Sequence, residues 1–122
     1  MTKRILVVED QEDLRGVLRT LLTGSGYEMI EAADGQAGVA KARAERPDLV
    51  LMDIQMPVLD GYEATRQIKA DPSLKATPII AVSSFAMKGD EEKARASGCD
   101  EYVTKPYSPM QLLKAVRRLL GE

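Results

Sequence analysis

Five residues with charged or reactive side chains stand at the ends of short apolar segments of the chain. They are Glu9, Asp10, Asp53, Ser83 and Lys105. If these segments are neighbouring parallel strands, the side chains meet at the carboxyl edge of one sheet, where ligands bind in open α/β proteins. Three acids, a hydroxyl and an amine gathered there are suited to the transfer of a phosphoryl group onto a carboxylate with the help of a metal ion.

The three acids of this set need a cation to offset their mutual repulsion. Two carboxylates about 4 Å apart repel each other by roughly 4 kcal/mol at an effective dielectric constant near 20. The expected ligands are all oxygens, and the chain contains no histidine. Oxygen ligands suit a hard ion, so we expect Mg²⁺, with Mn²⁺ as the alternative. Lys105 would add a second positive charge, and the Ser83 hydroxyl could donate to the phosphoryl group.

Each of the five residues, taken alone, has an ordinary structural alternative. Glu9 and Asp10 could lie at the start of a helix, where acids are common. Asp53 could be a turn residue, and Lys105 could be a solvated surface lysine. Ser83 alone carries no information. Their joint placement at four predicted strand ends favours a functional site over these separate roles.

Short apolar segments alternate with helical patterns five times along the chain, which indicates an α/β fold. The expected strands are Arg4–Val8, Glu28–Ala32, Leu49–Met52, Ile79–Ser83 and Glu101–Thr104. The first, third and fourth contain unbroken apolar runs, so they should be buried on both faces in the middle of the sheet. With right-handed crossovers, this predicts a flavodoxin-like, doubly wound parallel sheet in the order 2-1-3-4-5.

Capping residues and apolar periodicity place the helices between these strands. The third helix should begin at Asp60, and the fifth at Ser108, where Gln111 completes a capping box. The fourth helix, over about 90–97, has little besides Ala94 to bury and is therefore a candidate moving part. The first helix is expected to bury Leu14, Val17, Leu18, Leu21 and Leu22. The second is expected to bury the small residues Ala37, Ala40 and Ala44. The fifth is expected to bury Leu112, Leu113, Val116, Leu119 and Leu120.

The composition fits one globular domain spanning residues 1–122, with 44% hydrophobic residues and a formal net charge of -2. That charge provides no basic field for direct binding of nucleic acid, and no apolar run is long enough to span a membrane. Cys99 is the single cysteine and is expected to fill space in the core. Without an internal disulfide or a signal-peptide pattern, the expected location is the cytoplasm.

Four longer motifs extend the pattern: Ile5–Asp10, Leu51–Gly61, Pro78–Ser83 and Gly98–Pro106. Together they resemble the CheY-like receiver domains of response regulators, and the resemblance covers essentially the whole chain. The segment 85–92 is similar both to stand-alone receivers and to receivers fused to hybrid histidine kinases. The resemblance implies a two-component signalling switch that catalyses only its own phosphorylation and dephosphorylation. The phosphoryl donor would be a sensor histidine kinase or a histidine phosphotransfer protein.

The resemblance also implies a role for each residue of the site. The phosphoacceptor would be Asp53. The Mg²⁺ ligands would be Glu9, Asp10, Asp53 and the main-chain carbonyl of Gln55. The phosphoryl group would be bound by Ser83 and Lys105, the conformational switch would use Ser83 and Tyr102, and the Lys105–Pro106 peptide bond would be cis. An alternative for Tyr102 is an edge-strand aromatic residue that packs on the fourth helix.

One departure from the family concerns the two residues after the switch hydroxyl. Family members often have a small nonpolar residue where this chain has Ser84, and Phe85 follows it. The Phe85 ring cannot orient a water molecule and could cover the phosphoryl group, so we expect slow dephosphorylation. An outward-facing ring at a partner interface is the alternative. The Gln55 amide could either position a hydrolytic water or take its place.

Three other functions fit the sequence less well. A phosphatase of the haloacid-dehalogenase type needs a second Asp at the position of Gln55. A flavodoxin-like electron carrier would need to hold a flavin phosphate beside the acidic segment 9–13, which would repel it. A degenerate receiver that serves only as an interaction module is disfavoured because no site residue is missing.

The chain ends soon after the fifth helix, so we expect the switch to act through a separate, unidentified target protein. The first helix is the usual kinase-binding face of the family. The target-binding face would be formed by the fourth and fifth helices and the fifth strand, with the basic residues Lys88, Lys93, Lys114, Arg117 and Arg118. The alternative for most of these basic residues is ordinary solvated helix charge.

Overall fold

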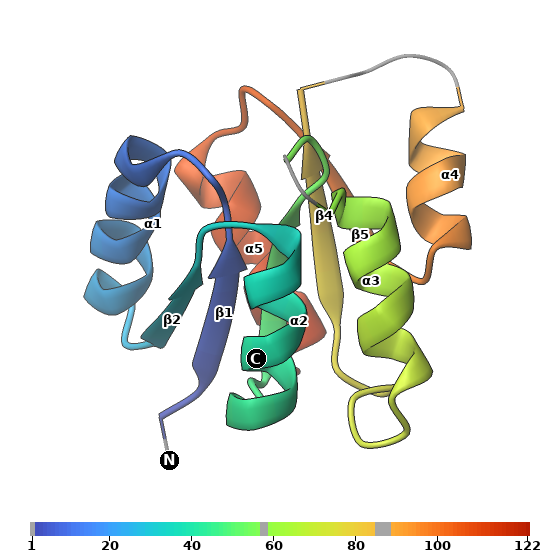
Figure 1. Ribbon diagram of the computed structural model, residues 1–122. Helices are drawn as coiled ribbons and strands as arrows, with labels where there is room; N and C mark the ends of the chain where they lie inside the picture. The colour runs from blue at the N-terminus through green and yellow to red at the C-terminus, as the bar shows by residue number, and fades with distance from the viewer. Residues whose placement is uncertain (1, 57–58, 85–88) are drawn as a thin grey trace.

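The computed structural model describes residues 2–56, 59–84 and 89–122 and contains one parallel sheet (Figure 1). The strands are β1 (Arg4–Val8), β2 (Glu28–Ala32), β3 (Leu49–Asp53), β4 (Ile79–Ser83) and β5 (Glu101–Thr104). Their order is β2-β1-β3-β4-β5, which confirms the predicted topology. β3 runs one residue further than expected because Asp53 still pairs with Val82 of β4.

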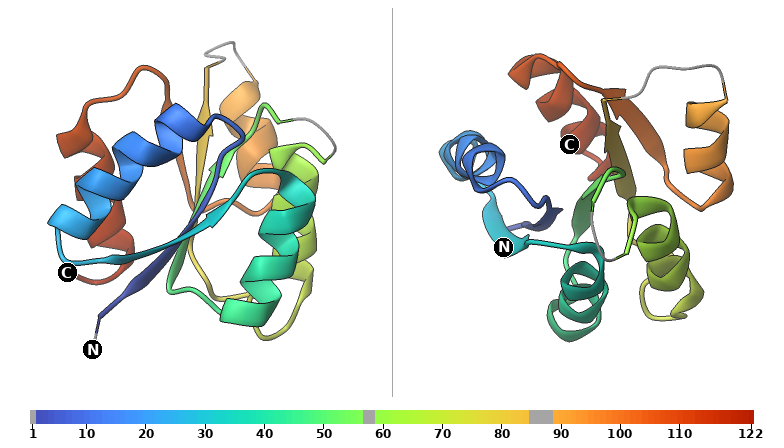
Figure 2. Two further views of the ribbon diagram at one scale, coloured as in Figure 1. Left: turned by 60° about the vertical axis from the view of Figure 1, so that its left-hand side comes forward. Right: turned by 45° about the horizontal axis from the view of Figure 1, so that its top comes forward.

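Helices cover both faces of the sheet, as the two views in Figure 2 show. The helices are α1 (Glu12–Gly24), α2 (Gly35–Glu45), α3 (Gly61–Ala70), α4 (Asp90–Ala96) and α5 (Pro109–Leu119). α1 and α5 lie on one face, and α2, α3 and α4 lie on the other (Figure 2). None of the helices that the structure describes is long and apolar enough to cross a membrane.

Two hydrophobic cores lie on opposite faces of the sheet. On β1, Leu6 and Val8 belong to the core beneath α2, α3 and α4, whereas Ile5 and Val7 belong to the core beneath α1 and α5. β3 and β4 are likewise buried along their whole length. Burial on both faces explains why the central strands carry unbroken apolar runs, while β2 and β5 have mixed sequences at the edges.

The buried face of α2 differs from the predicted one. Ala40 and Ala44 are exposed and Ala37 is only half-buried. Gly38 packs closely against β1, because a Cβ added there would lie 2.8 Å from the Val8 side chain. The helix therefore turns a glycine toward β1 and buries the set Gly35, Gly38, Val39 and Ala42. Small residues give little periodic contrast, which is why the alanine pattern was misleading.

The other helices follow their sequence patterns more closely. α5 begins with the complete capping box between Ser108 and Gln111, and the Asp60 side chain caps α3. α1 buries Leu18 and Leu22 but leaves Val17 63% exposed. The apolar stripe of α1 is wider than the surface that covers it, so Val17 lines an apolar groove beside the loop that follows β5.

Candidate functional site

The acids at the ends of β1 and β3 form one cluster. Carboxylate oxygens of Glu9, Asp10 and Asp53 all lie within 4.8 Å of one another. Glu9 and Asp53 are 4% and 5% exposed, whereas Asp10 faces solvent. The two strands are neighbours in the sheet, and their residues Val8 and Met52 pair. The strand order therefore brings together the three acids that the sequence placed at separate strand ends.

Lys105 provides the positive charge that faces this cluster. Its Nζ lies 3.1 Å from Glu9 Oε1 and 3.4 Å from Asp53 Oδ2. Burial by itself would lower the pKa of Lys105, but the carboxylates of Asp53 and Glu9 raise it above its ordinary value. The amine is therefore a cation at neutral pH. The peptide bond that follows it, Lys105–Pro106, is cis.

Main-chain N–H groups hold the two buried carboxylates from their other side. The N–H of Gln11 donates to Glu9 Oε2 over 3.1 Å, and that of Gln55 donates to Asp53 Oδ1 over 3.0 Å. Partial burial, together with a hydrogen bond and charge repulsion from Glu9, raises the pKa of Asp10. Three carboxylates facing one ammonium leave an excess of negative charge. All of their donor atoms are oxygens, so the cluster suits a hard divalent cation.

The position of Asp53 depends on a glycine that begins α3. The N–H of Gly61 donates to the Ile54 carbonyl over 3.1 Å. A Cβ at Gly61 would lie 2.4 Å from the main-chain oxygen of Asp53, which is closer than real side chains allow. Sequence reasoning noted Gly61 only as part of a motif. Its place directly after the helix-capping Asp60 was the available signal for this role.

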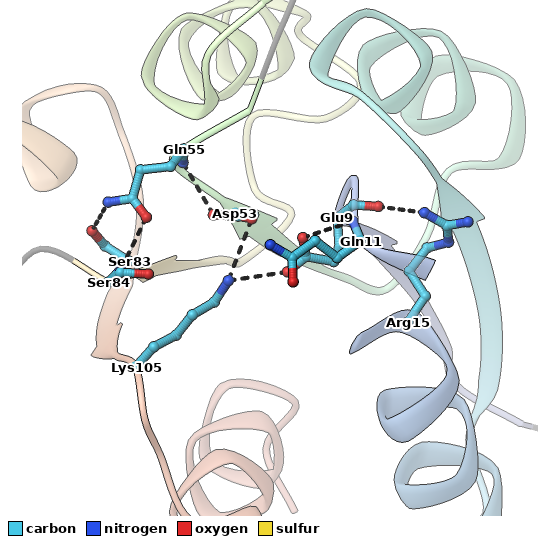
Figure 3. A network of polar contacts seen from close by, with 8 residues as sticks. All are labelled: Glu9, Gln11, Arg15, Asp53, Gln55, Ser83, Ser84 and Lys105. Atoms are coloured by element: carbon cyan, nitrogen blue, oxygen red, sulfur yellow. Dashed lines mark hydrogen bonds and ion pairs between the residues drawn. The ribbon is translucent and has the colours of Figure 1, made fainter. Parts of the chain in front are cut away.

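The Gln55 side chain crosses from the end of β3 to the end of β4 (Figure 3). Its Nε2 donates to Ser83 Oγ over 2.7 Å, and its Oε1 accepts the N–H of Ser84 over 3.0 Å. Ser83 is completely buried. Sequence reasoning assigned a role to the main-chain carbonyl of Gln55 but no definite one to its amide. No sequence pattern signals this bridge, because its partners are separated by 28 and 29 positions.

Arg15 supports the acidic loop from α1, and sequence reasoning missed it. Its guanidinium donates to the main-chain oxygen of Glu9 over 2.7 Å and to Glu31 of β2 over 3.2 Å (Figure 3 shows the first contact). Arg19 also pairs with Glu31. The hydrogen bonds and charge of Arg19 lower the pKa of Glu31, and Arg15 lowers it further. Burial by itself would raise this pKa, but its effect is smaller than that of the arginines. Arg15 thus ties α1 both to Glu9 after β1 and to β2, whereas Arg19 ties α1 to β2.

Tyr102 is half-buried on β5 and packs against the core that contains Ala94 of α4. The packing agrees with the structural alternative raised for this residue and leaves its role in a switch as a prediction. Phe85, the residue expected to slow dephosphorylation, lies outside the described residues, as does Lys88.

The basic residues expected on one face are distributed over three places. Lys114 and Arg118 line a groove of about 700 Å³ between β5 and α5. Arg117 instead lines a hollow at the amino end of the sheet with Tyr27. Lys93 stacks on a Tyr62 ring of α3, with Nζ 4.6 Å from the ring centre. The expectation of a shared basic face is therefore wrong for Arg117, because consecutive residues on a helix point in different directions.

Comparisons with known proteins agree on one family. A model described as the response regulator receiver domain matches residues 5–117. The polar-differentiation response regulator DivK of Brucella ovis is 43% identical over 122 residues, covering 100% of this chain and 99% of the relative.

Two solved structures show the same likeness in three dimensions. The receiver domain of the sensor histidine kinase PA1611 from Pseudomonas aeruginosa is 37% identical with a TM-score of 0.92, covering 100% of both chains. Its structure is described with a magnesium ion coordinated in the active-site cleft. The chemotaxis protein CheY4 of Vibrio cholerae is 30% identical with a TM-score of 0.92, covering 98% of this chain and 99% of that one.

Proposed function

Because the chain belongs to the response regulator receiver domain family, we propose that Asp53 is the phosphoacceptor of a two-component signalling switch. The observation that supports Asp53 most strongly is its central place in the site. β3 lies between β1 and β4, so Asp53 has the acids of β1 on one side and the hydroxyl of Ser83 on the other. It is also buried and lies within reach of Lys105.

The proposed reaction transfers a phosphoryl group between two proteins. A carboxylate oxygen of Asp53 attacks the phosphorus of a phosphohistidine, so a P–O bond forms and the P–N bond breaks. The electron pair of the broken bond stays on the histidine nitrogen of the donor. The chain itself contains no histidine, so the donor is a sensor histidine kinase or a histidine phosphotransfer protein. The ammonium of Lys105 then compensates the charge of the transferred group.

The proposed metal site uses the oxygens of the same cluster. Glu9, Asp10, Asp53 and the main-chain carbonyl of Gln55 would hold Mg²⁺, which would supply positive charge to the phosphoryl oxygens during transfer. The all-oxygen set and the excess of negative charge support this assignment. The magnesium ion described for the PA1611 receiver supports it as well. Mn²⁺ would fit the same ligands.

The output of the switch would depend on Ser83 and Tyr102. Ser83 would donate to the new phosphoryl group, and Tyr102 on the neighbouring strand β5 would respond. α4 is the element that can move, because Ala94 is its one buried residue in the described part of the chain. The changed surface of α4, β5 and α5 would bind a target protein in the cytoplasm. The chain would catalyse only its own phosphorylation and dephosphorylation.

The direct test is phosphorylation by a small donor. The parent protein and Asp53→Asn are incubated with acetyl phosphate and Mg²⁺, and their intact masses are measured. We expect one phosphoryl group on the parent and none on the variant. Asp13→Asn, which changes an exposed acid in the first turn of α1, is the matched control and should be phosphorylated like the parent. Equal phosphorylation of Asp53→Asn would refute the assignment.

A further inference from the structure

Both the nitrogen and the oxygen of the Gln55 side-chain amide form hydrogen bonds with the chain at the end of β4. The Ser84 N–H can only donate, so it requires the amide oxygen of Gln55 as its partner. The amide nitrogen must then face Ser83, and the Ser83 oxygen accepts from it over 2.7 Å. The orientation of the amide therefore follows from the chemistry of its two partners. The N–H of Gln55 also donates to Asp53, which holds the start of this bridge beside the carboxylate.

The two groups that Gln55 binds are the Ser83 hydroxyl at the end of β4 and the main-chain N–H of Ser84 just after it, on the strand that neighbours Asp53. Asp53 pairs with Val82, Ser83 is the last residue of β4, and Ser84 follows it directly. A phosphoryl group on Asp53 would carry three oxygens that need donors. Lys105 already faces the carboxylate of Asp53. The Ser84 N–H, by contrast, donates to the side-chain oxygen of Gln55. The Gln55 amide oxygen therefore already binds the Ser84 N–H, a donor that the phosphoryl group would use.

We propose that the Gln55 side chain is a latch that holds Ser83 and Ser84 in the unphosphorylated arrangement, and that a phosphoryl group on Asp53 displaces it. The inference rests on the proposed function of Asp53 as the phosphoacceptor. An anionic phosphoryl oxygen is a stronger acceptor than a neutral amide oxygen, so it takes over the Ser84 N–H. Gln55 is half-exposed, and its released amide can bond to water. Gln55 is in this respect a positioning residue.

The latch sets the balance between the two arrangements. A group that binds one arrangement better than the other shifts the population toward it. The two hydrogen bonds of the amide stabilise the resting arrangement and must be broken when the site closes on a phosphoryl group. Removing them should make that closure easier. The expected gain in affinity for a phosphoryl mimic is about fivefold, which corresponds to about 1 kcal/mol.

The test compares beryllofluoride binding by the parent and by Gln55→Met at saturating Mg²⁺. Methionine has a similar length but cannot replace the amide bonds. The dissociation constant is measured from the amide NMR signals of Ser84 and Tyr102. We expect about fivefold tighter binding by Gln55→Met, and a shifted Ser84 signal already in the absence of beryllofluoride. Gln36→Met, an exposed position of α2, is the control for the substitution itself and should bind like the parent.

Each outcome decides the proposal. Tighter binding by Gln55→Met supports the latch, and Gln55→Asn, too short to keep both bonds, should change in the same direction. Unchanged binding overturns the latch. Weaker binding also overturns it, because Gln55 would then be a ligand of the bound group. A parent that neither binds beryllofluoride nor accepts phosphate on Asp53 refutes the proposed function, and the latch with it.

Discussion

Neutralising Asp10 should stabilise the protein without metal and weaken its response to Mg²⁺. The carboxylates of Glu9, Asp10 and Asp53 lie within 4.8 Å of one another. Two unit charges at this separation repel each other by about 3.5 kcal/mol at a dielectric constant of 20 and by about 0.9 kcal/mol in bulk water. Because Asp10 is exposed, solvent screening places the effect near the lower value. Asp10→Asn should therefore raise the metal-free free energy of unfolding by about 1 kcal/mol.

Magnesium should cancel this advantage. At a free concentration ten times its dissociation constant, a bound ion stabilises the folded parent by about 1.4 kcal/mol. If the loss of one carboxylate weakens binding about tenfold, the same concentration stabilises Asp10→Asn by only about 0.4 kcal/mol. The two proteins should then have nearly equal stability with Mg²⁺, although they differ without it.

Urea unfolding followed by circular dichroism, with Mg²⁺ and with a chelator, measures all four free energies. Asp13→Asn is the control, because Asp13 is an exposed acid in the first turn of α1 outside the cluster. This control should change little in either condition. An Asp10→Asn variant that is less stable than the parent without metal, and equally stabilised by Mg²⁺, would contradict both the repulsion and the metal site.

Three further predictions concern stability. Gly61→Ala should lose about 1–3 kcal/mol, since its Cβ would lie 2.4 Å from the main-chain oxygen of Asp53. Gly16→Ala, in the middle of α1 with only a distant side-chain contact, should instead gain up to about 1 kcal/mol; thermal unfolding of both variants would refute the packing argument if the signs agree. Glu31→Gln should be less stable than the parent at pH 7. The folded pKa of Glu31 is lowered from 4.5, so its contribution is complete above that value and disappears as the pH falls through the lowered pKa. A stability difference that persists in acid would exclude this origin. Thr65→Val should gain about 1 kcal/mol, because the buried Thr65 hydroxyl has no hydrogen-bond partner among the described residues; a loss measured by urea unfolding would mean that the hydroxyl is satisfied.

The fold could be predicted because the sequences of the central strands show that both of their faces must be buried. An unbroken apolar run such as 5–8 or 79–82 is stable only when both faces are covered. Three such runs define the middle of the sheet, and the right-handed crossover rule leaves few ways to order the rest. Capping residues marked the helix starts for a similar reason, since the Ser108 hydroxyl acts within one turn of the chain.

The faces of the helices were predictable only where large side chains supply contrast. α5 buries Leu112, Leu113 and Val116 as its leucine pattern indicated. In α2, small residues occupy several faces, and the close approach of Gly38 to Val8 selects the buried one. That contact joins two elements, so periodicity within α2 could not reveal it. Val17 of α1 is exposed for a related reason, because the sequence cannot show how much of an apolar stripe its neighbours cover.

Part of the candidate site could be predicted from the sequence, and part of it could not. The sequence alone determined which residue types stand at the strand ends, and the sheet order followed from apolar patterns, so the meeting of Glu9, Asp10 and Asp53 could be anticipated. Only the tertiary structure decided which long side chains reach across the ends. The bridge from Gln55 to β4 and the contact of Arg15 with the Glu9 carbonyl each depend on rotamers and loop paths. Strand ends are fixed by burial over many residues, whereas a single hydrogen bond between distant segments leaves no periodic trace in the chain.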